Sequence, residues 1–246
     1  MSAATQSQAP AASTFAGALV DILERVEYRR VDAQALFDPV YRLRYEAYRR
    51  QQFIPFNSLG VLHDEFDNDP NAYCFGVYID GVLASSLRIH HLTPEMRFSP
   101  SYSVFTDVLT PLLDQGATFV DPTRFSSDFE ATLAYPALPF LTLRLAVMAT
   151  RHFTSTYGLH SVRPEHAAFY KRVLSSTLMA PTRFYHGLTF PMELWATKAQ
   201  EVYGKTIARY PFFASTGQER EELFGPRGQT AMRVRASAHA AVGDDA

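Results

Sequence analysis

The nine residues Phe-Val-Asp-Pro-Thr-Arg-Phe-Ser-Ser, running from Phe119 to Ser127, set the organisation of this chain. Two apolar residues predict a short strand over 118–121, and the carboxylate of Asp121 and the guanidinium of Arg124 flank a proline. Because Pro122 has no N–H to donate to a sheet ladder, we expect this strand to be open on one side. An opened central strand is a natural place for a ligand.

The amino-acid composition is that of an ordinary globular protein. The chain has 246 residues, of which 47% are hydrophobic, so it is long enough for one large or two small domains with a proper core. Its net charge of -2 argues against nucleic acid as a partner. No apolar run approaches the roughly 18 residues of a membrane span, and the start of the chain lacks the features of a signal peptide. We therefore expect a cytoplasmic protein with no integral membrane segment.

The chain offers few groups for metal or redox chemistry. Cys74 is its single cysteine, which excludes an intrachain disulfide and a Cys-rich metal site. The strand-like surroundings of Cys74 predict a small buried hydrophobe. Four histidines have no metal-ligand spacing, and no metal site is expected from them: His90, His91, His160 and His166.

Two β-hairpins and several helices follow from hydrophobic periodicity. The first hairpin pairs 73–79 with 82–91 around the turn Asp80-Gly81, a dipeptide typical of two-residue turns. The other predicted elements are helical spacing followed by a strand over 19–30, helices over 32–38, 40–52 and 104–109, a helix over 141–157 closed by Gly158, a strand over 159–162, a helix over 164–173, and a hairpin over 178–185 and 188–196.

These elements form one expected domain with a tail at each end. Residues 1–18 are predicted to be a disordered tail because the start of the chain is of low complexity. The single domain spans 19–213. Beyond it the chain turns polar and gains glycine, so 214–246 is predicted to be a flexible tail.

The order of elements, together with the run Pro-Glu-His-Ala-Ala-Phe-Tyr-Lys-Arg at 164–172, resembles the GNAT acyltransferase superfamily. The resemblance implies an α/β fold of three α/β/α layers with a mixed, V-split central sheet. The parted strands would admit the pantetheine arm of a thioester, which lies in the gap like an added strand.

One superfamily feature is missing. The usual Gly-rich loop, whose amides bind the pyrophosphate of coenzyme A, has no counterpart in 124–132, a segment without glycine. A pyrophosphate would meet Asp128 and Glu130 instead. This departure counts against a plain acetyl-coenzyme A enzyme.

The charged positions are similar to those of acyl-homoserine-lactone autoinducer synthases and the related N-acyl amino acid synthases. Six residues carry this resemblance: Arg44 in Arg-Tyr-Glu-Ala-Tyr, Asp64 and Asp67 in Asp-x-x-Asp, Arg88 in Ser-Ser-Leu-Arg-Ile, and Asp121 and Arg124 in place of a Glu-x-x-Arg. The family's glutamate is here a shorter aspartate. The family also carries an aromatic residue after the helix with the arginine, and the nearest equivalents in this sequence are Phe53 and Phe56. Both departures argue against S-adenosylmethionine as the acceptor, and they favour the N-acyl amino acid synthase branch.

The resemblance implies an enzyme that moves a fatty acyl chain from acyl carrier protein, or from coenzyme A, to the amino group of an apolar amino acid. Asp121 would take the ammonium proton, and Arg124 would hold the acceptor carboxylate or steady Asp121. The other four residues would form an alternating-charge lattice that binds the substrate and orders an N-terminal lid: Arg44, Asp64, Asp67 and Arg88. No tightly bound cofactor is implied. The structural alternative is that these charges are only a buried ion network.

Two further sets complete the expected site. An apolar acyl pocket is predicted from four residues: Phe105, Phe140, Leu141 and Trp195. A basic surface for the acidic carrier protein is predicted from four others: Arg144, Arg151, Lys171 and Arg172. The competing hypotheses are a GNAT-shaped ligand-binding or regulatory module without turnover, and a coenzyme A-dependent N-acetyltransferase.

Overall fold

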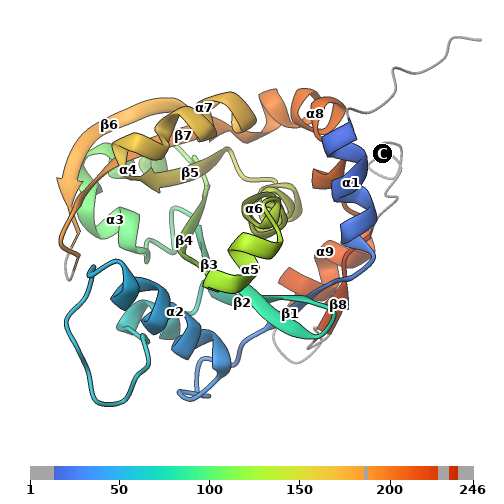
Figure 1. Ribbon diagram of the computed structural model, residues 1–246. Coiled ribbons are helices and arrows are strands. Elements are labelled where there is room, and N and C mark those ends of the chain that lie inside the picture. Colours follow the sequence, from blue (N-terminus) through green and yellow to red (C-terminus); the bar gives the residue numbers. More distant parts are fainter. Residues whose placement is uncertain (1–13, 186–187, 227–232, 238–246) are drawn as a thin grey trace, which may run out of the picture.

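The computed structural model describes residues 14–185, 188–226 and 233–237 as a mixed eight-stranded sheet with helices on both faces (Figure 1). The strands lie in the order β6-β7-β5-β4-β3-β2-β1-β8. Their bounds are β1 Val26–Arg30, β2 Ala72–Ile79, β3 Val82–Leu92, β4 Phe119–Ser127, β5 Tyr157–Val162, β6 Thr177–Phe184, β7 Pro191–Lys198 and β8 Arg233–Arg235.

The helices make the two outer layers, with α2, α3 and α4 on the left of the sheet in Figure 1 and α6, α8 and α9 on the right. The bounds are α1 Thr14–Leu23, α2 Pro39–Arg50, α3 Pro100–Val104, α4 Thr106–Asp114, α5 Phe129–Ala134, α6 Leu138–His152, α7 Ala167–Leu174, α8 Ala199–Arg209 and α9 Gly217–Phe224, with short 3-10 turns η1 Glu65–Asn68, η2 Pro164–His166 and η3 Pro211–Phe213. The expected three-layer α/β architecture is confirmed. In the described part of the chain, no helix combines the length and apolarity needed to cross a bilayer.

The central strands β4 and β5 part soon after they meet. They are the parallel pair of the sheet, and their ladder holds only Phe119 opposite Tyr157 and Val120 opposite Gly158. Beyond Val120, β4 runs on through Pro122 bonded to β3 on its other side, while β5 is bonded to β7. The seam that Pro122 predicts is therefore present at this place in the sheet.

A β-bulge in β4 follows the proline. The β3–β4 register places Thr123 opposite Arg88 and Ser126 opposite Ser86, so two residues of β4 face Leu87 alone. Arg124, one of those two, has a φ of 53°, in the left-handed region that non-glycine residues rarely occupy. In a regular strand, residues three apart lie on opposite faces. The bulge returns Arg124 toward the α2 side.

Most predicted elements are present. One predicted helix is absent, and another ends earlier than expected. The first hairpin is confirmed, with Ala72 opposite His90 and Ile79 opposite Val82. The helix expected over 32–38 is a pair of turns, because Asp38 instead caps α2 and Pro39 begins that helix. The helix expected to reach residue 157 ends at His152. Gly158 is not its cap but lies in β5, where a Cβ would approach Thr150 Cγ2 at 3.3 Å.

The expectation of tails needs correction at the C-terminal end. Helix α9 buries Leu223 and Phe224 in the main core, and β8 pairs with β1 at the sheet edge. Residues 217–224 and 233–235 are thus part of the domain, while 227–232 and 238–246 lie outside the described residues. At the other end α1 begins at Thr14, inside the predicted tail, and 1–13 lie outside the described residues.

Arg144, predicted to face a carrier protein, is fully buried on α6. Its guanidinium pairs with Glu219 of α9 through Nη1 at 2.5 Å and Nη2 at 3.0 Å, and it donates to the carbonyl oxygens of Phe212 and Ala214 at 2.8 and 2.6 Å. A buried charge of this kind persists only when it is paired and hydrogen-bonded. Arg144 is therefore the anchor that holds the C-terminal segment on α6, and it is unavailable for docking.

Replacing Glu219 with Gln keeps the shape of the side chain but leaves the Arg144 guanidinium buried without its counter-charge. We expect the free energy of unfolding to fall by about 3–5 kcal/mol, measured by urea denaturation. Glu221→Gln, on the exposed side of the same helix, is the matched control and is expected to unfold like the wild type. Equal stability of Glu219→Gln and wild type would contradict the anchoring role.

Candidate active site

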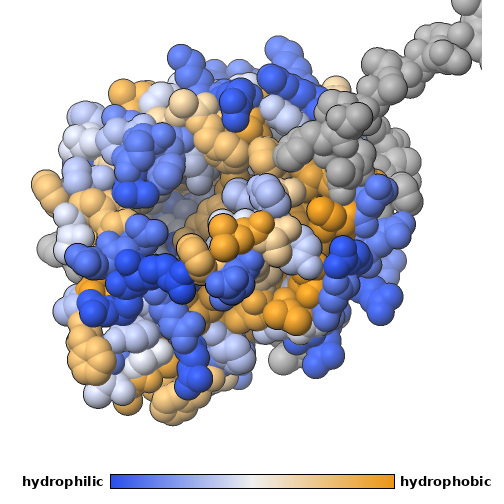
Figure 2. Space-filling view, viewed as in Figure 1, coloured by the Kyte–Doolittle hydropathy of each residue, from blue (hydrophilic) through white to orange (hydrophobic). Residues whose placement is uncertain are grey.

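The parted strands open into a cavity of about 940 Å³. Its walls come from α2 and the loop after it, from β4 and β5, and from α7, and the surface is visibly hollowed to the left of α5 in Figure 2. The lining is largely apolar and includes Phe53, Phe125, Leu143, Val162, Phe169 and Phe190. A second cavity of about 40 Å³ lies at the same seam. Pro122 and His160 line both, so the two cavities meet between β4 and β5.

An alternating chain of charges begins under α2. Arg44 is wholly buried, and its Nη1 lies 2.7 Å from Asp67 Oδ1. Cys74 Sγ donates to the same carboxylate oxygen at 3.1 Å, and burial raises the pKa of this thiol to about 11. The cysteine is therefore a protonated, buried member of the cluster and not a nucleophile.

The chain of charges continues across η1 to β3 and β4. Arg88 Nη1 contacts Asp67 Oδ2 at 3.1 Å and also pairs with Asp64 Oδ1. Asp64 Oδ2 then accepts from Arg124, from Nε at 3.0 Å and from Nη2 at 2.5 Å. The sequence Arg44, Asp67, Arg88, Asp64, Arg124 thus links four elements through charges of alternating sign, and we call these five residues the charge lattice.

The charge lattice holds both aspartates ionised. Burial alone would raise the pKa of the Asp67 carboxyl, but the guanidinium groups of Arg44 and Arg88 outweigh it and keep the pKa below its ordinary value. The same balance, with Arg88 and Arg124, lowers the pKa of Asp64. Three arginines face two aspartates, so the charge lattice carries one positive charge in excess. Its accessible end is Arg124, whose side chain is 16% exposed and lines the cavity.

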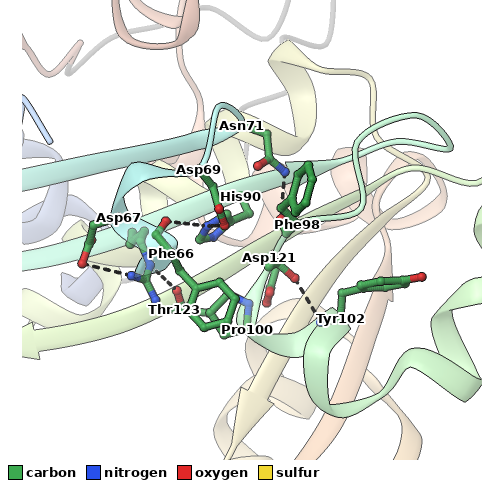
Figure 3. Close-up of polar contacts among 12 residues, drawn as sticks. Phe66, Asp67, Asp69, Asn71, His90, Phe98, Pro100, Tyr102, Asp121 and Thr123 are labelled. Atoms are coloured by element: carbon green, nitrogen blue, oxygen red, sulfur yellow. Dashed lines mark hydrogen bonds and ion pairs between the residues drawn. The ribbon is translucent and has the colours of Figure 1, made fainter. Parts of the chain in front are cut away.

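Asp121 lies apart from this cluster. Its side chain is fully buried against α3, where Ser101 Oγ donates to Oδ1 at 2.7 Å and the Ser101 backbone N–H donates to Oδ2 at 3.2 Å. Figure 3 shows Asp121 beside Pro100 and Tyr102 of α3 and away from Asp67. Asp121 and Arg124 therefore have different hydrogen-bond partners, and Arg124 does not steady Asp121 in this structure.

A family profile described as N-acyl amino acid synthase FeeM matches residues 39–198. The chain belongs to this family. It is accordingly an acyltransferase, and membership confirms the resemblance predicted from the charged positions. No curated protein sequence matches the chain.

Solved structures show the same GNAT-like fold. FeeM, an N-acyl amino acid synthase from uncultured soil microbes, superimposes with a TM-score of 0.60 at 19% identity, over 75% of this chain and 97% of that one. The AHL synthase LasI gives 0.51 at 15% identity, over 76% and 94%. BjaI, a CoA-dependent acyl-homoserine lactone synthase, gives 0.50 at 11% identity, over 76% and 90%.

The predicted acyl pocket of this FeeM-family chain is not where the cavity lies. Its four predicted residues line neither cavity: Phe105, Phe140, Leu141 and Trp195. Phe105 and Leu141 are core residues, and Phe140 packs on Phe212 of η3. On α6 the residues that line the large cavity are Pro139 and Leu143, which flank the predicted pair Phe140 and Leu141. Hydrophobic spacing identifies a buried helix face but does not say which part of it borders an empty space.

The predicted basic surface is reduced to α7. Lys171 and Arg172 are exposed near the end of that helix, whereas Arg151 is half-buried with its guanidinium over the Tyr203 ring at 5.2 Å. Of the four residues predicted for docking, Lys171 and Arg172 are therefore the exposed pair.

Several residues of the cavity were not singled out from the sequence. The guanidinium of Arg163, just after β5, lies 5.1 Å from the ring centre of Phe53 and 5.6 Å from that of Phe190, closing one side of the cavity. Ser161 and Tyr185 also line it. The strand prediction placed Ser161 on β5, but an isolated serine or tyrosine carries no motif that would have marked it.

Replacing Asp67 with Asn leaves Arg44 and Arg88 without their shared counter-charge, and we expect the free energy of unfolding at neutral pH to fall by about 3–5 kcal/mol. Because the pKa of Asp67 is lowered by folding, its stabilisation is complete above the unfolded value of about 3.9 and is lost as the pH falls through the lower folded value. Stability should therefore decline less steeply below about pH 4 in the variant than in the wild type.

Urea denaturation at a series of pH values measures both effects. Asp114→Asn, at a mostly exposed aspartate of α4, is the control and should keep the acid dependence of the wild type. Parallel stability profiles for Asp67→Asn and wild type below about pH 4 would show that the charge lattice does not hold Asp67 ionised.

Proposed function

We propose that this chain transfers a fatty acyl group from the thioester of acyl carrier protein to the amino group of an apolar amino acid. The observation that carries the proposal is the large apolar cavity at the β4–β5 seam of a FeeM-family chain. Strand backbone that lacks a neighbour offers N–H and C=O groups to an amide-rich pantetheine arm. The arm would lie along the seam, with the acyl chain in the apolar cavity.

The surroundings of β4 favour carrier protein over coenzyme A. Asp128, at the rim of the cavity, caps α5 by accepting from the backbone N–H of Ala131 at 2.8 Å. Its carboxylate occupies the N-terminal end of the helix that follows β4, so a pyrophosphate approaching there would meet negative charge. The exposed Lys171 and Arg172 offer the positive surface that an acidic carrier protein requires.

Two features of the cavity lining favour a particular class of acceptor. Aromatic side chains such as Phe53 and Phe190 suit an apolar side chain of the amino acid. The excess positive charge at Arg124 suits its carboxylate, which a guanidinium binds in a bidentate manner. These features favour an aromatic amino acid such as tyrosine or phenylalanine.

The reaction needs a neutral amine. An amino acid ammonium has a pKa of roughly 8 to 10 and must lose a proton before its nitrogen attacks the thioester carbonyl. The new C–N bond forms as the C–S bond breaks, and the thiol leaves with a proton. Charge on the carbonyl oxygen would be met by backbone N–H groups beside the seam. No covalent enzyme intermediate is required.

The donor is tested by supplying the purified protein with the dodecanoyl thioester of either acyl carrier protein or coenzyme A, together with L-tyrosine, L-phenylalanine or L-leucine. We expect free thiol release coupled to an N-acyl amino acid detected by mass spectrometry, with a higher kcat/KM for the carrier-protein thioester.

Charge reversal of Lys171 and Arg172 to Glu should lower kcat/KM for the carrier-protein donor by about tenfold or more and leave the dodecanoyl-pantetheine thioester unaffected. Arg235→Glu, an exposed arginine on β8 at the far edge of the sheet, is the control. A preference for coenzyme A would identify that thioester as the donor, and no amide product from any pair would refute the proposed reaction.

Arg124→Lys keeps the charge but loses the planar fork that matches a carboxylate. We expect KM for L-tyrosine to rise by about tenfold, which corresponds to about 1.4 kcal/mol, and KM for tyramine, which lacks the carboxylate, to stay unchanged. Steady-state kinetics with the two acceptors measures this difference. An equal rise for both acceptors would mean that Arg124 shapes the cavity without binding the carboxylate.

A further inference from the structure

Asp121, a carboxylate outside the charge lattice, is sealed from the cavity. Asp121 is fully buried and does not line the cavity, although it lies on β4 beside the seam. It makes no ion pair among the described residues, in contrast to Asp64 and Asp67, which are held by arginines. Of Asp64, Asp67 and Asp121, Asp121 is therefore best able to accept a proton.

A line of three hydroxyl groups joins Asp121 to the cavity wall. Ser101 Oγ lies 2.7 Å from Asp121 Oδ1 and 2.7 Å from Ser161 Oγ. The hydroxyl of Tyr185 is hydrogen-bonded to Ser161 Oγ and lies 3.2 Å from Ser101 Oγ. Ser161 and Tyr185 both line the cavity, while Ser101 is wholly buried behind them. The three hydroxyls come from α3, β5 and the end of β6.

The hydrogen bonds along this line run in one direction. An ionised carboxylate only accepts, so the single hydroxyl proton of Ser101 is donated to Asp121. The oxygen of Ser101 must then accept from Ser161, whose oxygen in turn accepts from Tyr185. The oxygen of Tyr185, a residue of the cavity lining, keeps a lone pair with which it can accept a proton from a bound group.

We propose that Tyr185, Ser161 and Ser101 relay a proton from the acceptor's ammonium group in the cavity to Asp121. This inference rests on the proposed function. The ammonium passes a proton to the Tyr185 oxygen as Tyr185 passes its own to Ser161, Ser161 to Ser101, and Ser101 to Asp121. One N–H bond is lost and one carboxyl O–H bond is gained, which leaves a neutral amine in the cavity and a neutral acid in the core.

The burial of Asp121 is suited to this role. Desolvation raises the pKa of its carboxyl, which brings the acid closer to the amine in proton affinity. Two other titratable groups face it, His90 from β3 and Tyr185 from the end of β6. His90 Nε2 is engaged with the Phe66 carbonyl oxygen at 3.0 Å and with Asp69 Oδ2 at 3.2 Å. The serine hydroxyls thus provide the hydrogen-bonded route from Asp121 to the cavity.

The test compares Tyr185→Phe, Ser161→Ala and Asp121→Asn with the wild type, using dodecanoyl-carrier-protein and L-tyrosine across pH 6 to about 10. We expect kcat near neutral pH to fall by about a hundredfold in each variant, with KM for the amino acid nearly unchanged. The deficit should shrink as the pH approaches the pKa of the amine, roughly 8 to 10, because the acceptor then binds already deprotonated. Ser161→Thr, which keeps a hydroxyl, should restore most of the rate.

Tyr102→Phe removes a hydroxyl from the same short helix α3, where it bonds to Thr110 and lies outside the cavity wall, and should behave as wild type. A loss of rate that is equal at every pH, or no loss in Tyr185→Phe and Ser161→Ala, would overturn the relay and leave the proposed transfer intact. Absence of transfer by the wild type with every acceptor would instead refute the proposed function and the relay with it.

Discussion

The structure depends on two parallel strands that stay hydrogen-bonded for only two residue pairs. Parting strands inside a sheet leaves backbone groups without neighbours, which is costly unless another partner takes them. Here β4 remains bonded to β3 and β5 to β7, so each strand keeps one complete ladder. Pro122 removes one donor from the exposed edge. The opening is therefore built into the sheet and does not require a ligand to create it.

Asp121 and Arg124, three positions apart on β4, lie in two different environments. The bulge sends Arg124 to the charge lattice, where opposite charges fix the ionised form of each aspartate. Asp121 is left among hydroxyl groups, where burial favours the protonated form. In the proposed reaction, β4 thus supplies one group that holds an anion and another that accepts a proton. Local surroundings and not residue type set the behaviour of each acid.

Local patterns predicted much of the fold and part of the site. The Asp80-Gly81 turn and the proline in β4 are short-range signals, and each led to the right element. The cluster around Asp64 and Asp67 was expected from the resemblance to the synthase family. The packing of α3 against β4, which encloses Asp121 with Ser101, is a tertiary contact that single-sequence patterns do not encode, so the burial of Asp121 away from Arg124 could not be predicted. Likewise, Arg144 was assigned to the surface because its partner lies 75 residues further along the chain.

That long separation has a consequence for how the molecule is made. During synthesis the chain emerges from its N-terminal end, and α6 becomes available well before α9. Until α9 is available, the guanidinium of Arg144 lacks its counter-charge, so burying this part of α6 costs free energy. The domain is therefore completed only after α9 has left the ribosome, and the Arg144–Glu219 pair then fixes this helix on α6.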